Sequence, residues 1–429
     1  MKKIMILAAA AALALVSCAK VETIQNTSEE DAISFGVYAG KTASKATYGD
    51  ITTASLQTST DGFGVFAYYT MNTAWSSAKT TATPNFMYNQ QVKYISEYGT
   101  PTDFTAARYP SHWYYSPLKY WPNGQNSTEV AAGTYVDKVS FFAYAPHTVS
   151  TPATGVVGTP YPGTGEGITA MSTNSTANAP TVTFTVPTNA DEQIDLLWAT
   201  PITDQTHQNL AGRVSFTFNH ALAKLNLQAQ AVVDAVSPDT ANLIDNGDAT
   251  LDEGETWILL QSLEVQADGT KTGTLSLNDG SWSGPVSGNS VITYDADAFN
   301  YGKTYPGTWS GSNTITVSAD SKTGFKVCET ARDLNSNISP MIIPAEVASS
   351  KFIVSANYWV ITKDAALNGG YSTVQQVIKK TSTSAITFAA GKKYTIVVRL
   401  GLNSLDFAVT EVTGWDDQSG DPIDLPVNS

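Results

Sequence analysis

The stretch ISFGVYAGKTASK, from Ile33 to Lys45, decides how the rest of the chain is organised. In its first half, Ile33, Phe35 and Val37 alternate with small or polar residues, which is the two-residue period of a half-buried β-strand. Its second half is a small, polar and basic run, a composition typical of exposed segments that proteases cut. The stretch therefore predicts a buried first strand that is followed by a cleavable connection.

The residues before this strand have the pattern of an export signal. Two lysines precede an apolar run from Ile4 to Val16, which is shorter than the ~20 residues that a membrane-spanning helix needs. The run ends at Ser17-Cys18, and a small residue before a cysteine is the lipobox of a bacterial lipoprotein precursor. We expect a lipoprotein signal peptide over residues 1–17, cleavage between Ser17 and Cys18, lipid on Cys18, and a polar tether over 18–32. The alternative is an ordinary signal peptide with an unrelated cysteine.

Composition limits the fold class and the function. Of the 429 residues, 42% are hydrophobic and only 14% are charged, and β-branched and aromatic residues favour strands over helices. The net charge of −14 argues against nucleic acid as a partner and suits an exported surface protein. Once Cys18 carries lipid, Cys328 is left alone and no intrachain disulfide is available. The fold must therefore depend on its hydrophobic cores.

Strand-like runs separated by turn residues continue along the chain. They cover residues 63–69, 139–146, 182–187, 194–199, 214–218, 259–265, 274–277, 314–317, 341–343, 352–359, 394–400 and 407–412. We interpret them as an all-β protein with antiparallel pairing throughout, arranged as two β-sandwiches.

The expected organisation is an N-terminal β-sandwich domain over 33–208, a C-terminal β-sandwich domain over 209–415, and a tail over 416–429. Minor short helices are expected near Ala221–Leu225 and Tyr371–Lys379. The Gly-, Pro-, Ser- and Thr-rich residues 148–179 are expected to form a long surface loop.

Several motifs, each weak alone, occur in a fixed order. They are the lipobox, GVFAYY (64–69), PNFMYNQ (84–90), SPLKYWP (116–122), DKVSFFAYAP (137–146), QIDLLWA (193–199), VSFTFNHALAKL (214–225) and VTGWDD (412–417). Together they cover nearly the whole mature chain. In this order they resemble the fimbrillin family of Bacteroidales, in its minor-fimbrial (Mfa-like) branch.

This resemblance implies two tandem transthyretin-like (Greek-key) domains, export to the outer membrane as a lipoprotein, and assembly into a type V pilus that supports adhesion. It also implies that a trypsin-like protease removes the N-terminal strand and that a C-terminal strand of another subunit replaces it. In many relatives the cut follows an arginine. Here Ser44-Lys45-Ala46 occupies that place, so we expect cleavage between Lys45 and Ala46.

The replacing strand should alternate like the strand that is lost. At the C-terminus Ile423, Leu425 and Val427 match Ile33, Phe35 and Val37 in spacing and kind, which makes them a candidate donor strand. Pro426 lacks an N–H group and would have to face away from the ladder. The alternative is a flexible acidic tail.

The sequence offers little catalytic chemistry. The four histidines have no ligand-like spacing, and His220 is expected to be structural. The stretch from Gly280 to Gly284 has Trp282 where a nucleophilic serine would stand. We therefore expect no enzyme and no cofactor. The remaining rival is an outer-membrane-anchored lipoprotein that binds surface glycans and does not polymerise.

Three further patterns have a functional and a structural interpretation. Asp245, Asp248, Asp252 and Glu255 are weak candidates for calcium ligands, and a solvated acidic loop is the alternative. Thr240 lies in an Asp-Thr-Ala pattern that resembles the O-glycosylation sites of this bacterial group. The aromatic residues of 109–121 are suited to stacking on host or microbial glycans or to packing inside a sandwich.

Overall fold

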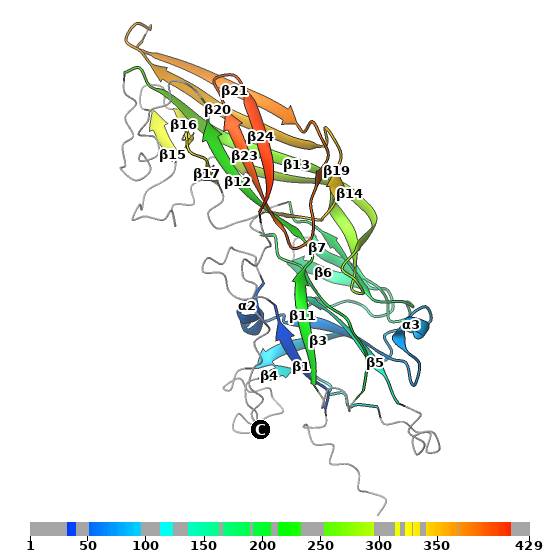
Figure 1. The fold of residues 1–429 in the computed structure, drawn as a ribbon. Coiled ribbons are helices and arrows are strands. Elements are labelled where there is room, and N and C mark those ends of the chain that lie inside the picture. Colours follow the sequence, from blue (N-terminus) through cyan, green and yellow to red (C-terminus); the bar gives the residue numbers. More distant parts are fainter. Residues whose placement is uncertain are drawn as a thin grey trace, which may run out of the picture.

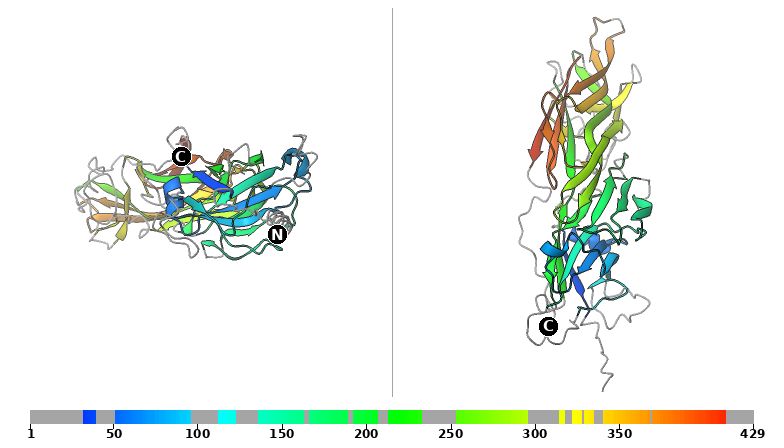
Figure 2. Two further views of the ribbon diagram at one scale, coloured as in Figure 1. Left: turned by 90° about the horizontal axis from the view of Figure 1, so that it is seen from below. Right: turned by 90° about the vertical axis from the view of Figure 1, so that its right-hand side faces the viewer.

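The structure is a computed structural model that describes residues 32–39, 51–95, 112–122, 136–162, 166–188, 192–206, 213–232, 253–295, 314–317, 322–327, 329–334, 340–367 and 369–412. The molecule is elongated, with the first half of the chain mainly at one end and the last third at the other (Figures 1 and 2). The helices α2 (Thr53–Thr58) and α3 (Trp75–Ala78) are short, and the expected all-β class with minor short helices is confirmed. Within these residues, no helix combines the length and the apolar character needed to cross a membrane.

An eight-stranded sheet forms one end of the molecule, in the order β10-β5-β2-β3-β4-β1-β11-β9. Its strands are β1 (Ser34–Tyr38), β2 (Phe63–Tyr69), β3 (Met87–Ile95), β4 (His112–Tyr114), β5 (Val139–Ala145), β9 (Leu197–Ala199), β10 (Ile202–Gln205) and β11 (Arg213–His220). Because β9 pairs with both β11 and β5, the sheet closes on itself. We call this closed sheet the barrel unit.

A nine-stranded sheet continues from the middle of the molecule to its other end. Its strands are β6 (Val156–Pro162), β7 (Gly167–Met171), β8 (Thr181–Thr185), β13 (Thr256–Ser276), β14 (Trp282–Asp295), β15 (Thr314–Val317), β16 (Lys322–Val327), β20 (Phe352–Lys363) and β21 (Tyr371–Thr381). Strand β13 is 21 residues long. Its first part pairs with β16 and β20, and its last part pairs with β8. One strand thus runs through both the middle and the far end.

A five-stranded sheet covers the nine-stranded sheet at the far end (Figure 1). Its strands are β12 (Ala223–Ala231), β17 (Arg332–Asp333), β18 (Met341–Ile342), β23 (Lys393–Leu400) and β24 (Leu405–Val412), and β19 (Glu346–Val347) pairs separately with β22 (Ile386–Thr387). In β23 and β20 the side chains alternate between buried and less buried, as expected for strands with one face on a core. The two sheets therefore form a sandwich.

The strands β2 and β5 are buried on both faces because they separate two cores. In β5, Phe141 packs into the core of the barrel unit, whereas Phe142 and Tyr144 pack into a second core in the middle of the molecule. This position explains why GVFAYY and VSFFAYA are continuous apolar runs without polar alternation. A third core lies within the far sandwich.

Three sequence expectations differ from the structure. Pairing is parallel between β1 and β11 and between β12 and β23, because alternation fixes the buried face of a strand but not the direction of its neighbour. The helices expected near 221–225 and 371–379 are wrong: β12 and β21 occupy those segments, and pairing with neighbouring strands overrides local helix propensity. The expected loop over 148–179 contains β6 and β7.

The expected division at 208/209 lies between strands that share sheets with both parts of the chain. Strand β11 follows it, yet β11 is the neighbour of β1 in the barrel unit, and β8 precedes it, yet β8 pairs with β13. The sheets thus combine segments from both sides. The division into two folding domains remains a proposal.

Candidate functional site

Strand β1 is an inner strand of the barrel unit (Figure 1). It runs parallel to β11 in a register from Ser34↔Arg213 to Tyr38↔Thr217, and its other edge meets β4 at Phe35↔Trp113. Both neighbours come much later in the chain. The N-terminal strand therefore completes a closed sheet that is built from residues after position 51.

The inward face of β1 is apolar and buried, as the alternation predicts. Ile33 is 1% exposed and Phe35 is 4% exposed. The ring of Phe35 stacks on Phe216 with 5.7 Å between centroids, and it also contacts Phe63, Tyr115 and Phe141. Burying a side chain of this size contributes about 1.5–3 kcal/mol, and each aromatic pair adds about 0.5–1.5 kcal/mol. Phe35 is thus the main anchor of the strand.

Polar contacts hold the start of the strand. The N–H group of Ile33 donates to the carbonyl of Lys119 at 2.9 Å, and the Tyr115 hydroxyl donates to the carbonyl of Ile33 at 2.8 Å. Burial raises the pKa of Tyr115 well above its usual value, so the hydroxyl keeps the proton that it donates. At the other end, the N–H group of Ala39 donates to the Thr53 hydroxyl at 2.8 Å.

The outward face of β1 carries small residues at Ser34 and Gly36, and a cation from β11 lies over Gly36. A Cβ atom built on Gly36 would lie 2.8 Å from Nη2 and 2.9 Å from Nε of Arg213. Glycine at this position therefore leaves room for the guanidinium group across the strand. The sequence alone contained no signal for this contact, because 177 positions separate the two residues in the chain.

A buried carboxylate ties the end of β11 to the segment that follows β1. Nδ1 of His220 lies 2.6 Å from Oδ2 of Asp195, and the same oxygen accepts a hydrogen bond from the N–H group of Ile51 at 3.3 Å. Asp195 is fully buried. The contact fits the structural role expected for His220, because it fixes the last residue of β11 next to β9.

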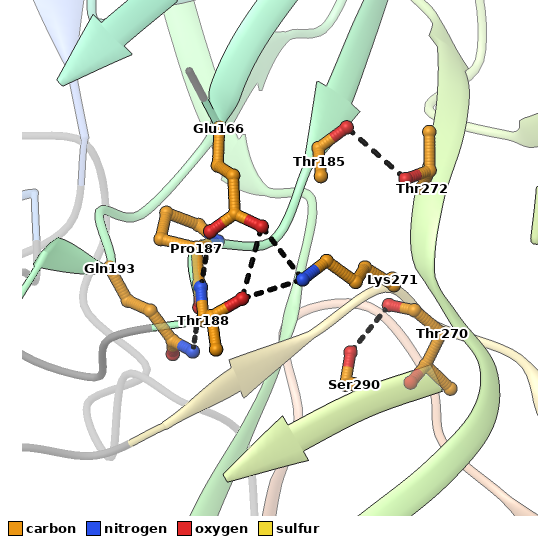
Figure 3. A network of polar contacts seen from close by, with 9 residues as sticks. All are labelled: Glu166, Thr185, Pro187, Thr188, Gln193, Thr270, Lys271, Thr272 and Ser290. Carbon is orange, nitrogen blue, oxygen red and sulfur yellow. Dashed lines mark hydrogen bonds and ion pairs between the residues drawn. The ribbon is translucent and has the colours of Figure 1, made fainter. Parts of the chain in front are cut away.

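A polar network joins the middle of the molecule to β13 (Figure 3). Nζ of Lys271 lies 2.7 Å from Oε1 of Glu166 and donates to the Thr188 hydroxyl at 2.6 Å. Buried Gln193 donates to the carbonyl of Pro187 and accepts from the N–H group of Met341. Burial alone would raise the pKa of Glu166, but the hydrogen bonds from Lys271 and Thr188 together lower it. We call this set of contacts the junction.

The comparisons with known proteins agree with the fold. The chain is 27% identical over 430 residues to the fimbrium subunit Fim1C of Phocaeicola vulgatus, and the match covers 97% of each chain. The expected resemblance to fimbrial subunits is confirmed. A fimbrial protein from Bacteroides vulgatus has the same fold, with a TM-score of 0.59 and 23% identity over 90% of this chain and 99% of that chain. No family model matches the chain.

Most of the sequence-predicted sites lie outside the described residues. This applies to the lipidation and signal-cleavage residues, the maturation cut, the candidate donor strand, the glycosylation candidate, the lone cysteine and three calcium candidates: Ser17, Cys18, Lys45, Ala46, Ile423, Leu425, Val427, Thr240, Cys328, Asp245, Asp248 and Asp252. Glu255 lies just before β13, and no group of three or more metal-ligating side chains occurs in the described ranges. The structure brings together only the removable-strand residues Ile33, Phe35 and Val37.

Three aromatic residues of 112–121 belong to the core that packs around β1: Trp113, Tyr115 and Trp121. Trp113 is buried and contacts Phe63 and Tyr94, and Tyr115 is buried under Phe35. Outside this segment, the Nε1–H group of Trp282, which stands where a nucleophilic serine would be expected, donates a hydrogen bond to the carbonyl of Ala221. Buried rings cannot stack on a sugar from solution, so the packing interpretation applies to Trp113 and Tyr115.

Proposed function

We propose that this protein is a subunit of a cell-surface fimbria that assembles when β1 is removed and a C-terminal strand of a neighbouring subunit takes its place. The observation that carries the proposal is the position of β1. It is a short inner strand at the N-terminal end of the chain, and its partners all come after residue 51. Similarity to Fim1C over nearly the full length supports the role of a fimbrial subunit.

Removing β1 would leave a slot in an otherwise complete sheet. Val214 and Phe216 of β11 and Trp113 of β4 would lose their apolar neighbour. Each buried backbone group without a partner costs about 1–3 kcal/mol. A strand from another subunit restores both the ladder and the apolar contacts. Because the donor and the slot are different surfaces, the contact repeats head to tail and builds a filament.

The remaining steps follow from the export signal and the family resemblance. The precursor is a lipoprotein held at the outer membrane through Cys18, and a trypsin-like protease cuts between Lys45 and Ala46. The mature subunit then enters the extracellular fimbrium and binds other fimbrial subunits. Its function is structural or adhesive rather than enzymatic, and surface glycans are a candidate target.

Truncating the mature chain after Trp415 tests the exchange step. Trypsin should convert the full-length protein into ladders that survive mild heating in detergent, and the truncated protein should be cut but stay monomeric. Lys45→Ala should prevent both cleavage and assembly. A chain that ends at Val427 is the matched control and should polymerise normally. Ladders from the Trp415 truncation would refute the proposal, and a full-length protein that is cut but stays monomeric would favour the glycan-binding rival.

A further inference from the structure

The guanidinium group of Arg213 lies across the outer face of the slot that β1 fills. Arg213 is the register partner of Ser34, and its Nη2 and Nε atoms occupy the space beside Gly36 that a Cβ atom would need. The side chain is half-buried. Any strand that replaces β1 must therefore present its outward residues to this cation.

The resident strand offers Arg213 no opposite charge. Its outward residues beside Arg213 are Ser34 and Gly36, and Arg213 forms no ion pair within the described part of the chain. The same strand supplies strong apolar contacts on its inner face. Strand β1 thus fills the core, and no carboxylate among the described residues forms an ion pair with Arg213.

The candidate donor strand carries the missing charge at the matching place. If Ile423, Leu425 and Val427 point inward, Asp424 points outward between the first two. In the direction of β1, Asp424 takes the position of Ser34, beside Arg213. In the opposite direction, Asp424 takes the position of Gly36. Its Cβ would lie 2.8 Å from the present position of Nη2, so the flexible end of Arg213 must shift before it pairs with the carboxylate. Both directions place the carboxylate next to Arg213, since neighbouring strands are about 4.8 Å apart.

We infer that Arg213 is a specificity-determining residue of the slot, and that it recognises an acidic residue on the outer face of the incoming strand of a second copy, namely Asp424. The inference rests on the proposed strand exchange and adds to it a means of distinguishing donor from placeholder. Apolar alternation is common to both strands, whereas the charge pair forms only after exchange. Opposite charges also speed the encounter of a strand with its slot.

A charge swap in the full mature chain tests the inference. Arg213→Glu and Asp424→Arg should each slow the formation of ladders after trypsin treatment roughly tenfold, because each replaces an attraction by a repulsion. The double variant R213E/D424R restores the pair in reverse and should regain a rate within about threefold of the unmodified protein. Lys93→Glu on the exposed face of β3 and Asp421→Arg in the tail are the matched controls, and both should assemble normally.

The outcomes separate this inference from the exchange mechanism. Melting of the uncleaved R213E precursor at the same temperature as the parent protein would show that the barrel unit is intact. Normal assembly of both single variants, or a double variant no faster than the slower single variant, would overturn the role of Arg213 while leaving strand exchange in place. Failure of the unmodified protein to assemble, or assembly of the Trp415 truncation, would instead refute the exchange itself.

Discussion

Strands β1 and β13 are both paired on two edges, yet they are integrated into the fold in opposite ways. Strand β1 has five residues and is held by β11 and a single pairing with β4. Strand β13 has 21 residues, pairs with β8, β14, β16 and β20, and extends from the middle of the molecule to its far end. Strand β1 thus depends on few pairings, whereas β13 is bound to four other strands; the proposed strand exchange would use the less integrated of the two.

The largest expected effect compares one buried side chain from each strand. Phe35→Ala in β1 and Leu260→Ala in β13 should each lower the free energy of unfolding of the uncleaved protein by about 3–5 kcal/mol, because each leaves a cavity in a packed core. After cleavage and release of β1, the effect of Phe35→Ala should vanish and that of Leu260→Ala should persist. Urea unfolding before and after trypsin treatment measures both.

Ser34→Ala is the control for this pair, because Ser34 is exposed and its substitution should change stability by less than about 0.5 kcal/mol. A difference between Phe35→Ala and the parent protein that survives cleavage would mean that β1 stays bound after the cut. The contrast between a removable and a permanent strand would then be wrong.

Acid should weaken the barrel unit and the junction in different pH ranges. His147, which lies two residues after β5 of the barrel unit, is buried, and burial lowers its pKa from 6.5 to about 4. As the pH falls below 6.5, the unfolded chain binds a proton that the folded chain excludes, so stability is lost between about pH 6.5 and 4. The loss should amount to about 2–4 kcal/mol. The lowered pKa of Glu166 acts later, since its contribution is lost only as the pH falls below 4.5.

His147→Gln tests this assignment, because glutamine keeps polar atoms but does not titrate. Urea unfolding of the parent protein and the variant at pH 7, 5.5 and 4 should show a smaller loss in the variant over this range. Equal slopes would show that His147 does not govern acid stability. Glu166→Gln is the matched control. It should lower stability slightly at every pH, because the pair with Lys271 is lost, but it should change the slope with pH only near pH 4 and below.

Local sequence patterns predict the faces of strands well and their neighbours poorly. The alternation of Ile33, Phe35 and Val37 predicts the buried face that the structure shows. The same pattern gives no direction for β11, and the contact between Gly36 and Arg213 depends on that direction. The sequence pattern does not predict β6 and β7, because Gly, Pro, Ser and Thr dominate residues 148–179. The pairing of β7 with β8, and of β6 with β7, stabilises both strands despite weak local propensity.

The smallest effect sharpens the comparison at the junction beside β13. Lys271→Met should lower the free energy of unfolding by about 0.2–1 kcal/mol, because its ion pair with Glu166 is about one-quarter exposed and partly screened by solvent. The hydrogen bonds of Thr188 to Glu166 remain in the variant, which limits the loss. A double-mutant cycle with Glu166→Gln should give a coupling of the same size that shrinks in 0.5 M salt, about three times the physiological concentration.

Lys351→Met is the matched control for this cycle. Its Nζ atom lies 3.4 Å from Oδ2 of Asp268, and the two side chains are 59% and 39% exposed, so the pair should contribute nothing measurable. Equal effects of Lys271→Met and Lys351→Met would show that the junction pair is an ordinary surface contact. The contribution of β13 to stability would then come from its backbone hydrogen bonds and its apolar core alone, and the polar network of the junction would add no measurable free energy.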